Sequence, residues 1–71
     1  MKLTEAISYI EPYTVICLTH KNMTEDWYRS LRFIPESVKE RNPEVLSIGA
    51  IHPERNEFRL NEPAIRLYLN D

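Results

Sequence analysis

A single cysteine, Cys17, is the feature that most constrains how this 71-residue chain folds. One cysteine excludes an intramolecular disulfide, and so short a domain buries only about 60% of the surface that its unfolded chain exposes. Chains of this size commonly add a disulfide, a metal or a partner subunit to a core that supplies roughly 3–5 kcal/mol. We therefore expect one densely packed domain over residues 1–71 that associates as a homodimer.

The first apolar residues of the chain repeat with the period of a helix. Leu3, Ala6, Ile7 and Ile10 stand at i, i+3, i+4 and i+7, which forms one apolar stripe. Pro12 ends this pattern, because proline disfavours the helical conformation in the residue before it. The spacing predicts a short N-terminal helix that packs one face against the rest of the domain.

Two strands and a second helix are predicted next. Residues 13–19 are rich in β-branched side chains and apolar on both faces, which is typical of a strand inside a sheet. Residues 27–34 form the second predicted strand, joined to the first as an antiparallel hairpin by the polar loop 20–26. Residues 34–43 predict a brief helix with Pro35 in its first turn.

The run VLSIGAIHP, residues 45–53, contains the only glycine of the chain. Both faces of this run are mostly apolar, so we expect it to be a central strand. Glycine in a strand costs roughly 0.5–1 kcal/mol, and a packing gain should offset that cost. We expect a large ring to lie over the small residues there: Trp27, Tyr9 or Tyr13 over Ser47, Gly49 and Ala50.

The C-terminal third predicts a polar turn over 52–57, a short strand over 58–60 and a clear final strand over 64–69. In the final strand, alternation directs Ile65, Leu67 and Leu69 to the core and the residues between them to the other face. The complete prediction is a compact α+β domain with the order helix–β–β–helix–β–(β)–β. Its sheet is mainly antiparallel, the N-terminal helix covers one face, and the second helix is short.

The residue types that carry catalysis or metals do not form a recognisable site. Cys17 and His20 stand in a C-x2-H arrangement with His52 far along the chain, but zinc sites of this kind have a second cysteine or paired histidines. Ser47 lacks the strained turn of a serine nucleophile. With one glycine, a glycine-rich phosphate loop is excluded. We expect no enzyme activity, no metal and no cofactor.

Arginine and aromatic residues suggest an interaction surface instead. If their strands are neighbours, the outward faces bring arginines and tyrosines together, as protein-binding hot spots and single-stranded nucleic-acid binders do. The plainer interpretation is a solvated face with cross-strand ion pairs to Glu57 and Glu62. The formal charge of −2 disfavours nucleic acid without excluding it. The candidate residues are Tyr28, Arg29, Arg32, Phe58, Arg59, Arg66 and Tyr68.

The cellular setting is expected to be the cytoplasm. The single cysteine fits a reducing compartment, and the N-terminus has Glu5 where a signal peptide needs an apolar core. No apolar run approaches the roughly 20 residues that a membrane-spanning helix requires. We therefore expect no membrane partner.

Several short stretches resemble a group of small, uncharacterised proteins from bacteriophages and mobile elements of Gram-positive bacteria. The chain departs from their pattern at Ser30, where they often have glycine, and over residues 52–63, a longer connection than theirs. The resemblance implies an accessory protein that binds and blocks a host factor, and it supplies no catalytic residues. The matching pieces are Met1-Lys2-Leu3, Tyr13-Thr14, Tyr28, Ile34-Pro35, Val45-Leu46-Ser47-Ile48 and Ile65-Arg66-Leu67.

Overall fold

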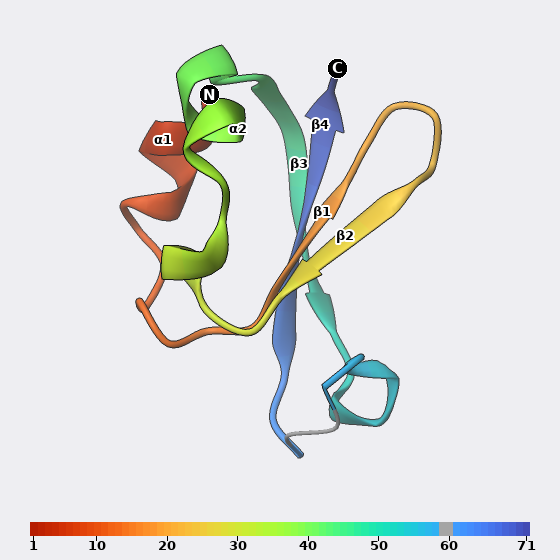
Figure 1. The fold of residues 1–71 in the computed structure, drawn as a ribbon. Coiled ribbons are helices and arrows are strands. Elements are labelled where there is room, and N and C mark those ends of the chain that lie inside the picture. Colours follow the sequence, from red (N-terminus) through yellow and green to blue (C-terminus); the bar gives the residue numbers. More distant parts are fainter. Residues whose placement is uncertain (59–60) are drawn as a thin grey trace.

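The computed structural model describes residues 1–58 and 61–71, which form a mixed four-stranded sheet with two short helices on one face (Figure 1). This confirms the predicted small α+β fold. The strand order across the sheet is β2-β1-β4-β3. The elements are α1 (Leu3–Ile7), β1 (Ile16–Thr19), β2 (Glu25–Tyr28), η1 (Leu31–Phe33), α2 (Glu36–Arg41), β3 (Glu44–Ile51), η2 (Pro53–Arg55) and β4 (Ala64–Asn70).

Strands β1 and β4 form the centre of the sheet. β1 pairs antiparallel with β2, as the predicted hairpin requires, and parallel with β4. β4 in turn pairs antiparallel with β3. All four residues of β1 are buried, which confirms that this strand lies in the interior. The sheet is thus mixed, with two antiparallel pairings and one parallel pairing.

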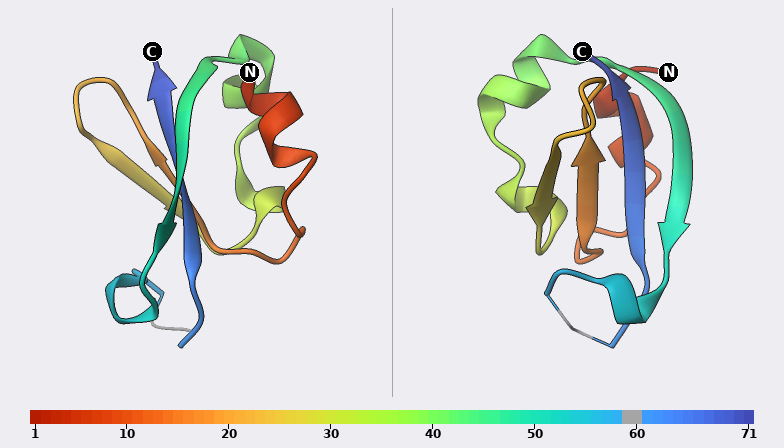
Figure 2. Two further views of the ribbon diagram at one scale, coloured as in Figure 1. Left: turned by 180° about the vertical axis from the view of Figure 1, so that it is seen from behind. Right: turned by 90° about the vertical axis from the view of Figure 1, so that its right-hand side faces the viewer.

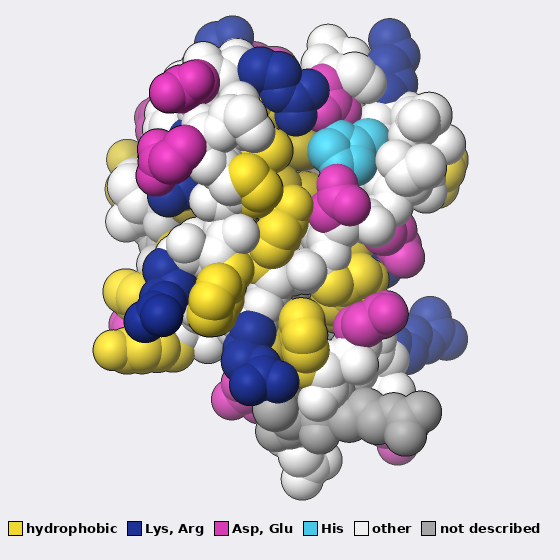
Figure 3. Space-filling model, in the orientation of Figure 1, with side chains coloured by type: hydrophobic (Ala, Val, Ile, Leu, Met, Phe, Trp, Pro, Cys, Tyr) yellow, Lys and Arg dark blue, Asp and Glu magenta, His cyan; other side chains and the backbone are white. Residues whose placement is uncertain are grey.

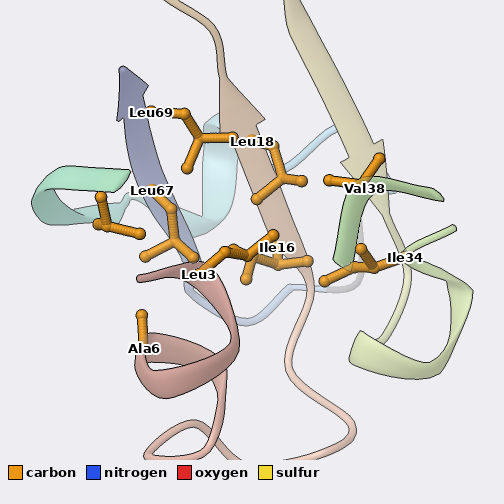
Figure 4. Packing of buried hydrophobic residues seen from close by; sticks show 9 residues of the cluster. Leu3, Ala6, Ile16, Leu18, Ile34, Val38, Leu67 and Leu69 are labelled. Atoms are coloured by element: carbon orange, nitrogen blue, oxygen red, sulfur yellow. The ribbon is translucent and has the colours of Figure 1, made fainter. Parts of the chain in front are cut away.

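The main core lies between the sheet and the helices (Figure 4). Leu67 and Leu69 of β4 point into it and are fully covered, while Ile65 packs at its margin, as the alternation predicted. The helices contribute Leu3 and Ala6 from α1 and Val38 from α2. The buried members are Leu3, Ala6, Ile16, Leu18, Ile34, Val38, Val45, Leu67 and Leu69.

A second, smaller cluster covers the other face of the sheet. Trp27 and Phe58 pack against its four buried residues, which come from β1, β3, β4 and the residue before β1. The connection between β3 and β4 folds over this face and is held by Asn56, whose side chain donates to the Glu62 carbonyl at 3.0 Å and accepts from the Phe58 N–H at 2.9 Å. The buried residues of this cluster are Val15, Cys17, Ile51 and Ala64.

The second predicted strand, 27–34, is wrong in both its bounds. β2 ends at Tyr28, and a 3-10 turn follows over Leu31–Phe33. The chain leaves the sheet because the Leu31 N–H donates to the carbonyl of Pro12 at 3.1 Å and Ser30 is buried. β2 also begins earlier than predicted, because Met23, at φ 71°, closes a tight hairpin loop.

The prediction that the glycine-containing strand is central is also wrong. β3 lies at the edge of the sheet, because β4 occupies the place next to β1. Leu46 and Ile48 are accordingly 60% and 53% exposed. The expected ring over Gly49 is absent within the described residues, since a Cβ built at this position meets no atom within 4 Å. Leu46 is an extra residue in the pairing with β4, at an irregularity between Val45 and Ser47.

The short strand predicted over 58–60 falls mostly on residues 59–60, outside the described part of the chain. Phe58 itself lies in a turn.

Replacing Leu18 with alanine should lower the free energy of unfolding by about 2–5 kcal/mol, because the side chain is fully buried and its loss leaves a cavity. Urea denaturation followed by circular dichroism measures the effect. The control is Tyr9→Ala, which removes more atoms from a side chain that is 76% exposed and should change stability by only about 0.5 kcal/mol. Equal losses in the two variants would contradict this placement of the core.

Candidate functional site: an arginine–aromatic surface at the end of β2

The structure divides the predicted interaction face into two groups. Tyr28, Arg29, Arg32 and Phe58 lie together where β2 ends. Arg66 and Tyr68 lie on β4, and Arg59 is outside the described residues. The prediction of one continuous sheet face is therefore wrong, because Arg29 and Arg32 follow β2 and do not belong to a strand.

The group at the end of β2 forms what we call the arginine–aromatic surface. The guanidinium carbon of Arg29 lies 5.4 Å from the ring centre of Phe58, and that of Arg32 lies 5.0 Å from the ring centre of Phe33. Both distances are typical of cation–π contacts. In Figure 3, basic and hydrophobic side chains lie side by side over the lower part of the visible face. The surface comprises Trp27, Tyr28, Arg29, Arg32, Phe33 and Phe58.

Two shallow depressions run across this surface and meet at Arg29 and Phe33. One lies between Tyr13 and the η1 turn, and the other between Trp27 and Phe58. Tyr13 is 83% exposed and Phe33 is 51% exposed, so large apolar area faces solvent beside the arginines. Exposed aromatic and arginine side chains in one patch are the composition of a protein-binding hot spot.

The two arginines of the surface have no acidic partner. Both are exposed, and across residues 1–58 and 61–71 neither has a carboxylate oxygen within 4.0 Å. Stacking on a ring orients a guanidinium but leaves its in-plane N–H donors available. The surface therefore offers two oriented cations to an incoming acceptor.

Local structure explains how these side chains come together. The hydrogen bond from Leu31 to Pro12 and the burial of Ser30 fold the chain back after β2, which places Arg32 and Phe33 beside Arg29. Sequence reasoning missed Phe33 as a surface residue, because the residue was placed inside the strand expected over 27–34. The signal that pointed elsewhere was Ile34-Pro35, which limits how far a strand can extend.

Arg66 has a different role from Arg29 and Arg32. It forms an ion pair with Glu25 and donates a hydrogen bond to the Thr19 hydroxyl at 2.7 Å. The bond from Arg66 lowers the pKa of Glu25, and the same bond raises the pKa of Arg66. Glu57 and Glu62 were the predicted partners of the sheet-face arginines, but it is Glu25 that pairs with Arg66, because β2 brings it opposite Thr19. Arg66 thus ties three strands together on the outer face.

Tyr68 stays exposed beside Arg66, with its ring centre 5.8 Å from the guanidinium carbon. It lies on β4 opposite Ser47 of β3. Arg66 is neutralised by Glu25, and the exposed Arg55 of η2 lines the same shallow depression as Arg66 and Tyr68.

Cys17 and the two histidines lie in separate environments. Cys17 is fully buried, and burial raises the pKa of its thiol, which contacts the Thr19 hydroxyl at 3.7 Å. The ring of His52 accepts a hydrogen bond from the Glu54 N–H at 3.3 Å at the start of η2. Within the described residues, no three or more His, Cys, Asp or Glu side chains are placed so that they could hold a metal ion.

His20 bridges two carboxylates near the C-terminal end of β4. Its Nε2 lies 2.7 Å from Asp26 and its Nδ1 lies 2.8 Å from Asp71. Burial acts to lower the pKa of His20, but the hydrogen bonds to Asp71 and Asp26 outweigh it, and the pKa is raised above its ordinary value. A doubly protonated ring donates to both carboxylates at once, so the contact joins the β1–β2 loop to the end of the chain.

No helix in the described part of the chain combines the length and the apolar character that crossing a bilayer demands. Comparison of the sequence with family models, with curated proteins and with solved structures found no match in any of the three.

His20 makes stability depend on pH. Since its pKa is raised on folding, its contribution is fully present below the unfolded value of about 6.5 and is lost as pH rises through the folded value. We expect the free energy of unfolding to fall as pH rises above about 6.5, and His20→Gln to flatten this slope. Urea denaturation across this range measures it. His52→Gln is the control and should keep the slope; an unchanged slope in His20→Gln would refute the assignment.

Proposed function

We propose that this chain is a non-enzymatic binding protein that acts by protein–protein interaction through the arginine–aromatic surface. The observation that carries the proposal is the pair of exposed arginines, Arg29 and Arg32, each stacked on an aromatic ring and without an acidic partner among the described residues. Their natural complement is a protein surface with carboxylates next to an apolar anchor. The carboxylates take the guanidinium donors, and the anchor fills the depression beside Phe33.

The charge distribution favours a protein over a nucleic acid. Single-stranded nucleic acid binders track the phosphate backbone with a row of cations. Here Arg66 is neutralised by Glu25, and the chain has a formal charge of −2. Two arginines suffice for one acidic patch on a protein but give a short footprint for a phosphate chain. A nucleic-acid-associated module is the alternative, and it depends on the same stacked arginines.

The biological setting of the proposal comes from the sequence resemblance. It is an accessory protein of a phage or mobile element that works in the cytoplasm of a Gram-positive host and blocks a host factor. The buried thiol of Cys17 is compatible with a reducing compartment.

The test is capture from a lysate of a Gram-positive bacterium, identification of the retained protein, and titration of that purified protein by calorimetry. Arg29→Ala with Arg32→Ala should weaken its binding at least about tenfold, since both cations of the surface are removed.

The matched control is Lys21→Ala with Arg55→Ala. It removes the same charge from two exposed positions away from the surface and should leave binding unchanged. Equal binding by both double variants would overturn the proposal. Tight binding of a single-stranded oligonucleotide at low salt, lost in the arginine variant alone, would establish the nucleic-acid alternative instead.

A further inference from the structure

The outer side of β3 is an open strand edge. β3 pairs with β4 on one side, and on the other side residues 1–2 cover only its beginning, through the Lys2–Glu44 bridge and a 2.7 Å hydrogen bond from the Val45 N–H to the Met1 carbonyl. In the described part of the chain nothing pairs with this side of residues 46–51. Such an edge presents N–H and C=O groups that another strand can bind.

This edge lacks the features that usually prevent strand addition. Residues 45–51 contain no charged residue and no proline, and Leu46 and Ile48 expose apolar side chains. β2 forms the opposite edge of the sheet (Figure 2). This edge differs, because β2 has only four residues and carries exposed Glu25 and Asp26. Short, charged edges resist pairing, whereas a long neutral edge favours it.

We propose that two copies of this chain pair through β3 in antiparallel orientation, about a two-fold axis beside Gly49, and join their sheets into one. The register follows from the two ends of the open edge. Residues 1–2 block it before Leu46, and Pro53 cannot continue it after His52. The open run consists of residues 46–51 of β3 and His52, whose ψ of 141° continues the extended chain up to Pro53. This run, 46–52, is centred on Gly49, so antiparallel pairing of two such runs aligns Ser47 with Ile51.

Charge identifies the occupant as a second copy. The open run carries no formal charge, so two copies bring no like charges together and the edge has nothing to select a charged foreign strand. In this register, the exposed Glu54 of one copy lies beyond the strand end, near Glu44 of the other copy. The carboxylate of Glu44 is already paired with the Met1 amino group and Lys2 of its own copy, so the two ends bring no uncompensated like charges together. The acidic β2 edge disfavours head-to-tail growth, which leaves a closed dimer.

The dimer gives the single glycine a role. Within one copy, the space over Gly49 is open for at least 4 Å. On the axis, the two glycines face each other, where any side chain would meet its own copy. The dimer is independent of the proposed function, because Arg29 and Arg32 follow β2, at the edge of the sheet opposite β3.

The test is Gly49→Lys in the full chain, studied by analytical ultracentrifugation at micromolar concentrations. The lysine meets open space in a monomer, so the fold is retained, but in the dimer two lysines lie opposite each other and should weaken association about tenfold. The control is Ser37→Lys, which adds the same charge at an exposed position on α2 and should leave association unchanged.

Mixing Gly49→Lys with Gly49→Glu should restore the dimer as a heterodimer, because the axis then places opposite charges face to face. Hydrogen exchange of the unaltered chain gives a second readout: β3 amides should become more protected as concentration rises. A monomeric parent chain, a Gly49→Lys dimer as tight as the parent, or a mixture that stays monomeric would each overturn the proposal.

Discussion

The parallel pairing of β1 with β4 is the interaction on which the rest of the structure depends. It aligns Ile16 with Ile65 and Leu18 with Leu67, residues from opposite ends of the chain. The helices cover the inner face of both strands, and on the outer face Trp27 and Phe58 pack against the smaller buried cluster. The rest of the outer face is polar, because Arg66 pairs there with Glu25 beside the exposed Tyr68. A chain without a disulfide thereby gains a core with two layers of apolar contacts.

This central pairing also decides which edges the sheet has. With β1 and β4 inside, β2 and β3 become the borders, and the two borders differ in character. The β2 border is short and charged and leads into the turn that holds Arg29 and Arg32. The β3 border is long and neutral, and its apolar side chains Leu46 and Ile48 face solvent. The chain thus carries two edges of different character on opposite sides of one sheet.

The polar interactions are arranged around the same centre. On the outer face, Arg66 of β4 donates a hydrogen bond to Thr19 of β1 and forms an ion pair with Glu25 of β2. These contacts connect three neighbouring strands. His20 similarly connects the hairpin loop with the end of the chain beyond β4. Arg29 and Arg32 differ from Arg66, because they stack on aromatic rings and have no acidic partner in the described residues. This difference separates structural arginine from arginine available for recognition.

The sequence by itself determined the elements whose pattern depends only on local period. The stripe of Leu3, Ala6 and Ile7 predicted α1, and the β-branched run predicted β1. Alternation predicted that Leu67 and Leu69 of β4 are buried, because a side chain's direction follows from its place in a strand. The exposed aromatic and arginine residues were also identified by type, although not as the two groups that exist.

Only the tertiary structure decided the rest, since it depends on partners far along the chain. Apolar residues on both faces of 45–51 are compatible with a central strand as well as with an edge strand. β3 lies at the edge because β4 pairs with β1 and occupies the central position. The end of β2 at Tyr28 follows from a hydrogen bond between Leu31 and Pro12, which no local pattern encodes. Gly49 was expected to lie under an aromatic ring, but it borders open space. A missing side chain permits close approach of another group, but the local sequence does not determine which group, if any, packs there.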